Sequence, residues 1–115
     1  MSDITRIEPG KRMAQAVIHN SVVYLAGQVG TGPDVTAQCQ DALAKVDQLL
    51  AEAGSDKSRM LSCTIWLADM ADFAAMNAVW EAWIDPANPP ARATGEAKLA
   101  TPDYRVEFII TAALG

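Results

Sequence analysis

The sequence predicts an α+β fold in which two helices lie on one face of a mixed, mainly antiparallel sheet. Short apolar segments, several with period-two alternation, indicate strands. Two longer segments repeat apolar residues at three- and four-residue steps, which is typical of helices. The predicted order is strand, strand, helix, strand, helix, strand, strand. At 115 residues with no low-complexity segment, we expect a single domain spanning residues 1–115.

Composition excludes several classes of protein. Half of the residues are hydrophobic and a fifth are charged, which indicates a globular chain and not a disordered one. The net charge of -5 argues against a general nucleic-acid binder, which needs a positive surface. No apolar run approaches the roughly 20 residues of a membrane span, and no leader is evident. We therefore expect a cytoplasmic protein in which Cys39 and Cys63, which lack metal-site spacing, are reduced and buried.

The first third of the chain predicts a hairpin. A short strand is expected around residues 4–7. Residues 14–18 and 22–26 then form two strands joined by a turn at 19–21, because Asn20 tolerates positive φ. His19 is the only histidine, and its place beside this turn favours a solvated residue over a catalytic one.

A glycine-rich segment, residues 27–33, leads from the hairpin to the first helix. It lacks the Gly-Lys-Ser/Thr ending and the glycine spacing of phosphate-binding loops. We expect it to let the backbone approach another chain or a ligand closely. The helix follows over residues 35–53, with Asp34 as the N-cap and Gly54 after its last turn.

The middle of the chain predicts a strand over residues 60–68 and a second helix. Asp69 and Asp72 are both candidate caps of that helix, and Pro86 stops it. Large residues at helical steps mark its inner side: Phe73, Met76, Trp80, Trp83 and Ile84. Aromatic residues in this pattern are more typical of a core than of a ligand cage.

The last quarter of the chain contains the candidate site. It is interpreted as a hairpin of two strands around a turn at residues 100–103, with Arg92 on the first strand and Glu107 on the second. Glu107 lies in a run of Val, Phe and Ile residues, where an uncompensated carboxylate costs several kcal/mol of desolvation. We therefore expect Arg92 and Glu107 either to have a functional role or to form an ion pair with each other.

The last strand is also apolar on both faces. Two helices can cover only one face of the sheet, and the other would expose a larger apolar patch than soluble monomers tolerate. We expect that second face, which includes Glu107, to be buried against other copies of the chain.

Several segments together resemble the Rid family, also called YjgF or endoribonuclease L-PSP-like. The resemblance covers nearly the whole chain and rests on Pro90-Ala91-Arg92, Arg105-Val106-Glu107, Tyr24-Leu25-Ala26-Gly27-Gln28 and Asp72-Phe73-Ala74-Ala75-Met76-Asn77. It implies a chorismate-mutase-like fold and a homotrimer with active-site clefts between subunits. It also implies an enamine/imine deaminase that hydrolyses reactive 2-imino acids to 2-keto acids and ammonia.

The resemblance implies a role for individual residues as well. Arg92 would bind the substrate carboxylate, and Glu107 would position or activate the attacking water. Backbone groups near Gly27 and Thr94 would contact the small imino or keto acid, with no cofactor and no metal.

The chain departs from the best-known deaminases at three positions. Met13 stands where they have tyrosine, Ala26 where they have serine, and Thr94 where they often have cysteine. The loss of polar groups at Met13 and Ala26 keeps a second hypothesis open, a non-catalytic binder of small carboxylates such as 2-keto acids. Ribonuclease or chaperone activity is a third, and the acidic net charge weakens the ribonuclease reading.

Overall fold

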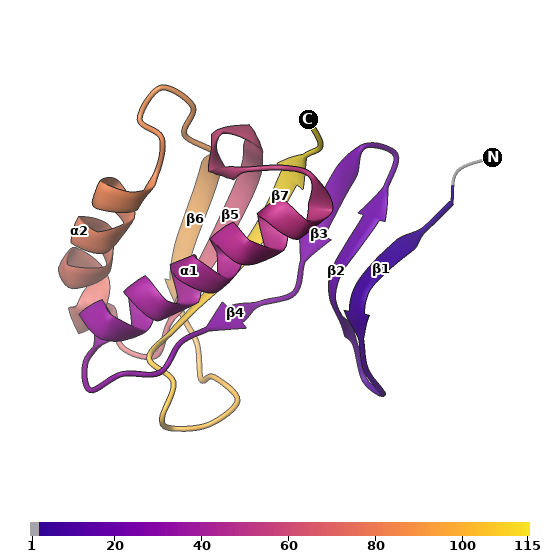
Figure 1. Cartoon of the computed structure of the whole chain (residues 1–115). Helices are drawn as coiled ribbons and strands as arrows, with labels where there is room; N and C mark the ends of the chain where they lie inside the picture. Colours follow the sequence, from indigo (N-terminus) through magenta and orange to yellow (C-terminus); the bar gives the residue numbers. More distant parts are fainter. Residues whose placement is uncertain (1–2) are drawn as a thin grey trace.

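A single seven-stranded sheet with two helices on one face makes up the fold (Figure 1). It was obtained as a computed structural model that describes residues 3–115. The strands are β1 (Thr5–Pro9), β2 (Ala14–His19), β3 (Val22–Leu25), β4 (Gln28–Val29), β5 (Met60–Leu67), β6 (Ala91–Glu96) and β7 (Val106–Ala113). The helices are α1 (Val35–Ala53) and α2 (Phe73–Trp83), with single 3₁₀ turns η1 (Lys57–Arg59) and η2 (Met70–Asp72) before β5 and α2.

The strand order is β1-β2-β3-β7-β5-β6, and the short strand β4 also pairs with β7. Only β5 and β6 are parallel, because helix α2 carries the chain across from one to the other. The other pairs are antiparallel. This confirms the predicted α+β class with a mixed, mainly antiparallel sheet.

The hairpin of β2 and β3 forms as predicted, with its turn at Asn20 and Ser21. Both residues have positive φ, 52° and 65°, which is the geometry of a two-residue type I′ turn. His19 is the last residue of β2 and pairs with Val22, so the strand extends one residue further than expected.

One pairing prediction was wrong. Strands β6 and β7 do not form a hairpin, because β5 lies between them and pairs with both. A turn does exist, with the Tyr104 amide donating to the Thr101 carbonyl, but it belongs to a longer loop. The two ends of that loop are held by backbone hydrogen bonds to Leu67 and Ala68 at the end of β5. The turn residues predicted that the chain reverses direction here, but they did not predict which strands pair with each other.

Both ends of helix α1 are capped as the sequence predicted. The Asp34 side chain accepts from the Ala37 amide at 2.8 Å. Gly54 adopts the left-handed conformation, with φ of 85°. The helix buries one stripe against the sheet, and its N-terminal part also packs against α2.

Helix α2 begins differently from the prediction. Asp69 caps the η2 turn by accepting from the Ala71 amide, whereas Asp72 makes no side-chain cap. The Asp72 carboxylate instead accepts from Arg105 Nε at 3.1 Å and from Nη2 at 2.7 Å. Gln38 of α1 accepts from the Arg105 backbone amide at 2.8 Å. These three residues form a clamp that joins the start of β7 to both helices.

The two faces of the sheet differ sharply in burial. Along β7 every second residue is buried beneath the helices, while Glu107, Ile109, Thr111 and Ala113 lie on the opposite face and are only half-buried. Neither helix covers this second face, which is called the open face below (Figure 1). Tyr24 of β3 lies on it and is 49% exposed.

Both cysteines are buried and free, as predicted. Burial raises the pKa of the Cys39 and Cys63 thiols to about 12, so neither is a thiolate at neutral pH. Within residues 3–115, no helix has the length and hydropathy needed to cross a membrane.

The clamp makes a prediction about stability. Arg105→Ala should lower the free energy of unfolding by about 2 kcal/mol, because Asp72 would keep its charge without a partner. The Arg105 side chain is 42% exposed, so the loss should be smaller than for a fully buried pair. Urea unfolding measures this loss of free energy, and Arg6→Ala on the exposed edge strand β1 is the control. Equal losses in the two variants would contradict the clamp.

Candidate functional site

Arg92 lies on edge strand β6, on the face of the sheet that carries the helices. It pairs in register with Cys63, which is buried beneath them. Its Nη1 donates to Asn77 Oδ1 of helix α2 at 2.8 Å. Within residues 3–115, Nε and Nη2 of Arg92 donate no hydrogen bond, so one edge of the guanidinium is available. Such an edge binds a carboxylate through two parallel hydrogen bonds.

Two aromatic rings of α2 help to fix this guanidinium. Arg92 Cζ is 5.7 Å from the ring centre of Trp80 and 6.0 Å from that of Phe73. Trp80 in turn stacks on Phe108 of the core. Phe73 was predicted to face inward, but it is 37% exposed because it packs beside Arg92 at the edge of the sheet.

Thr94 follows Arg92 by two residues on β6 and therefore faces the same side. It pairs with the buried Ile65 of β5. Its Oγ1 is buried and has no hydrogen-bond partner within residues 3–115. A buried hydroxyl without a partner is uncommon, and it lies next to the Arg92 side chain on the same strand.

Glu107 lies on the open face, between Val29 of β4 and Trp66 of β5 in the register. Its carboxylate rests against Gly27. A Cβ atom at position 27 would lie only 2.7 Å from Glu107 Cδ, so glycine lets this side chain lie here without moving. The glycine-rich segment was expected to admit another chain or a ligand, whereas Gly27 admits a side chain of the same chain.

A bulge places Gly27 at this point. Tyr24 pairs with Thr111 and Gln28 with Phe108, so the stretch from β3 to β4 holds one more residue than the part of β7 it faces. The extra residue falls at Ala26 and Gly27, where the ladder is interrupted. Ala26 is half-buried, and its amide donates to the Gln15 carbonyl at 2.8 Å.

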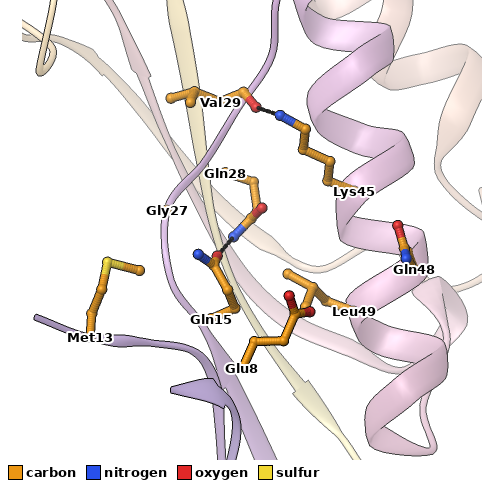
Figure 2. A pocket seen from close by; sticks show the side chains of 9 residues that line it. All are labelled: Glu8, Met13, Gln15, Gly27, Gln28, Val29, Lys45, Gln48 and Leu49. Atoms are coloured by element: carbon orange, nitrogen blue, oxygen red, sulfur yellow. Dashed lines mark hydrogen bonds between the residues drawn. The ribbon is translucent and has the colours of Figure 1, made fainter. Parts of the chain in front are cut away.

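Met13 and Gly27 line a cavity of about 460 Å³ between the β1–β2 hairpin, β4 and α1 (Figure 2). Met13 is 49% exposed. The remaining lining is largely polar and includes Glu8, Gln15, Gln28, Lys45 and Gln48. Of these five, only Gln28 belongs to a segment quoted in the sequence analysis; the other four come from β1, β2 and α1 and share no motif.

The structure thus contains two groups of candidate residues. Arg92 and Thr94 lie beside α2 at one edge of the sheet, and Glu107 lies with Gly27 on the open face. Since Arg92 pairs with Cys63 and Glu107 with Trp66, and these two β5 residues face opposite sides, one chain does not bring Arg92 and Glu107 together. Asn77 is the residue that holds Arg92. Its spacing from Phe73 and Trp80, which puts the three residues on one face of α2, is the sequence pattern that could have identified it.

Among residues 3–115, no three His, Cys, Asp or Glu side chains are grouped so that they could hold a metal ion.

Comparison with known proteins places the chain in a family. The sequence model of "Endoribonuclease L-PSP" matches residues 3–114. The chain belongs to the endoribonuclease L-PSP family.

Relatives of high similarity in this family are named after RutC and YjgF. A RutC family protein of Haemophilus ducreyi is 45% identical over 113 residues, covering 96% of this chain and 97% of the relative. The RutC family protein YoaB of Escherichia coli is 42% identical, covering 96% and 98%. A solved YjgF family member from Neisseria meningitidis is 44% identical with a TM-score of 0.97, covering 98% and 96%. These L-PSP family relatives cover nearly the whole chain and confirm the resemblance seen in the sequence.

Two glycines of the L-PSP domain should respond differently to substitution. In Gly30→Ala, the new Cβ would lie 2.2 Å from the Gln38 carbonyl oxygen and 2.8 Å from the Ala42 amide nitrogen. Both belong to the α1 backbone, which cannot move away, so the free energy of unfolding should fall by about 2 kcal/mol or more. Gly27→Ala should cost less than about 1 kcal/mol, because the flexible Glu107 side chain can move. Urea unfolding of both variants measures the two losses in free energy of unfolding. A larger loss in Gly27→Ala than in Gly30→Ala would contradict the packing described.

Proposed function

We propose that this protein is an enamine/imine deaminase that hydrolyses 2-imino acids. Water adds to the carbon of the C=N bond, and the resulting carbinolamine expels ammonia to leave a 2-keto acid. Family membership supports this reaction class. The observation that carries the proposal is the open edge of Arg92, a guanidinium held by Asn77 with Nε and Nη2 unengaged.

Arg92 would bind the carboxylate common to all 2-imino acids. Asn77 fixes the guanidinium from one side, and the rings of Phe73 and Trp80 lie on another. A preoriented fork loses little side-chain entropy on binding, so it can orient the imine carbon for attack. The backbone near Thr94, on the same strand, would complete this half of the site.

Glu107 would accept a proton from the attacking water and return it to the departing amine. Its carboxylate rests on Gly27 and has no hydrogen-bond or ion-pair partner within residues 3–115, so it is free to hold a water. A protonated imine is already electrophilic, and little beyond orientation and one base is needed.

The complete site would form between two copies of the chain. Arg92 and Glu107 lie on opposite faces of one sheet, so a substrate touching both requires a second subunit. The open face carries apolar groups such as Ile109 and the 49% exposed Tyr24, and its burial between copies would assemble a homotrimer. Each cleft would then join Arg92 of one subunit to the Gly27 and Glu107 of its neighbour.

A second candidate, a non-catalytic binder of small carboxylates such as 2-keto acids, is favoured by Met13 and Ala26. Both contribute apolar groups near Gly27, where a hydroxyl would help to place water. The two functions share Arg92 and differ in whether Glu107 is needed, which makes Glu107 the discriminating residue.

Single substitutions test the two roles. Arg92→Ala should lower kcat/KM roughly 10²–10³-fold, because a bidentate charge-assisted contact to the substrate carboxylate is lost. Glu107→Gln should lower kcat by roughly 10²–10⁴ with little change in KM. The assay is ammonia release from an imine generated in situ by an amino-acid oxidase or threonine dehydratase.

Matched controls are Arg6→Ala and Glu52→Gln, which remove exposed charges outside both groups. Both should keep wild-type rates. Calorimetric binding of a 2-keto acid with no turnover by the wild-type protein, and unchanged binding in Glu107→Gln, would replace the deaminase with the binder.

Mixing the two inactive variants tests whether the site is shared. When Arg92→Ala and Glu107→Gln subunits are dissociated and reassembled together at equal amounts, about a quarter of the clefts should combine an intact Arg92 with an intact Glu107. Activity should return to that fraction of the wild-type value. A reassembled mixture as inactive as its parents would show that each chain carries a complete site.

A further inference from the structure

Gly27 and Val29 connect the proposed cleft with the cavity of about 460 Å³ between the β1–β2 hairpin, β4 and α1 (Figure 2). Both residues line this cavity. The Glu107 carboxylate rests against Gly27, and Glu107 pairs with Val29 in the sheet register. A cavity of this volume is in the range of small-molecule sites. A substrate held at Glu107 would therefore have this space beside it for its side chain.

Gln15 and Gln28 are the polar side chains that define the chemistry of the inner part of this cavity. Gln28 is 6% exposed and Gln15 is half-buried, whereas Glu8 and Gln48 of the lining are exposed. The amine of Lys45 is already engaged, since it donates to a backbone carbonyl of β4 at 2.9 Å and lies 3.7 Å from a carboxylate oxygen of α1. The inner part of the cavity is therefore bounded by two neutral amides, which Figure 2 shows hydrogen-bonded to each other.

A backbone carbonyl fixes how these two amides are oriented. Gln28 Nε2 donates to the Ala26 carbonyl at 3.1 Å, and because a carbonyl can only accept, the nitrogen of the Gln28 amide must lie on this side. The same nitrogen donates to Gln15 Oε1 at 3.0 Å, which fixes the Gln15 amide in turn. Two amide atoms then make no hydrogen bond within residues 3–115, the acceptor Gln28 Oε1 and the donor Gln15 Nε2. The pair offers a ligand one acceptor and one donor, and neither atom carries a net charge.

We propose that the preferred substrates are 2-imino acids whose side chain ends in a carboxamide. This inference rests on the proposed function, because it assigns the side-chain pocket of the same site. The N–H of a carboxamide would donate to Gln28 Oε1, and its carbonyl oxygen would accept from Gln15 Nε2. A carboxylate lacks the donor, an ammonium group lacks the acceptor, and an alkyl group lacks both. A site that hydrogen-bonds one group discriminates against isosteres that leave its own polar atoms unpaired.

Isothermal titration calorimetry with isosteric acids tests this pocket without requiring turnover. Glutaramate, glutarate and 5-methylhexanoate each carry a carboxylate for Arg92 and have a similar shape, and they differ in the group at the far end. Succinamate and adipamate, compared with succinate and adipate, extend the series to chains one methylene shorter and one longer. The amide of best-fitting length should bind about tenfold or more tightly than its isosteres.

A substitution at Gln15 tests whether the glutamine pair causes this preference. Gln15→Met removes the Nε2 donor and keeps the length of an uncharged side chain. It should reduce the preference for glutaramate over 5-methylhexanoate to about twofold or less. Gln40→Met, on the exposed surface of α1 and outside this cavity, is the matched control and should keep the wild-type preference.

Initial rates on imines that an amino-acid oxidase forms from glutamine, methionine and leucine separate this inference from the proposed function. The glutamine-derived imine should have the highest kcat/KM. Amide preference in binding with no imine hydrolysis would overturn the deaminase and keep the pocket, whereas hydrolysis with equal kcat/KM for the three imines would do the reverse. Equal affinity of the wild-type protein for the amides and their isosteres, or an unchanged preference in Gln15→Met, also overturns the pocket.

Discussion

The alternation of side chains along β7 is the constraint on which the rest of the structure depends. This strand lies between β3 and β5, pairs also with β4, and carries Val106, Phe108 and Ile110 into the core with 0% exposure. A shift of one residue would move all of them to the open face. The same alternation directs Glu107 outward, so the position of this carboxylate follows from the burial of its neighbours.

The clamp around Arg105 fixes where this alternation begins. Arg105 immediately precedes β7, and its bonds to Asp72 and Gln38 hold the start of the strand against both helices. The same Asp72 stands at the first turn of α2, the helix that positions Arg92 through Asn77. One ion pair thereby connects the register of the central strand to the helix that holds the guanidinium. The proposed site thus depends on residues that do not touch a substrate.

Local patterns predicted the parts of the fold that depend on local physics. Capping by Asp34 and Gly54, the positive φ of Asn20 and the two faces of the last strand are each determined within a few residues, and each was found as expected. The order of the strands was not predictable in this way, because the insertion of β5 between β6 and β7 depends on pairing between distant segments. Arg92 and Glu107 were noticed as charges in apolar surroundings, but their placement on opposite faces follows from that strand order. The polar residues that line the cavity beside Gly27 come from three strands and from helix α1, so only the folded chain groups them.

The division of the candidate residues between two faces bears on how the proposed activity could evolve. Asn77, Phe73 and Trp80 fix Arg92 within its own chain, and Gly27 makes room for Glu107 within its own chain. In the proposed assembly, subunit association would only have to bring two ordered halves together, so it would add little conformational entropy cost at the site. Met13 and Ala26 belong to the surroundings of Gly27 and contact neither the guanidinium nor its supports within residues 3–115. In the proposed deaminase, substitutions there would alter which imino acid is accepted while Arg92 keeps its supports.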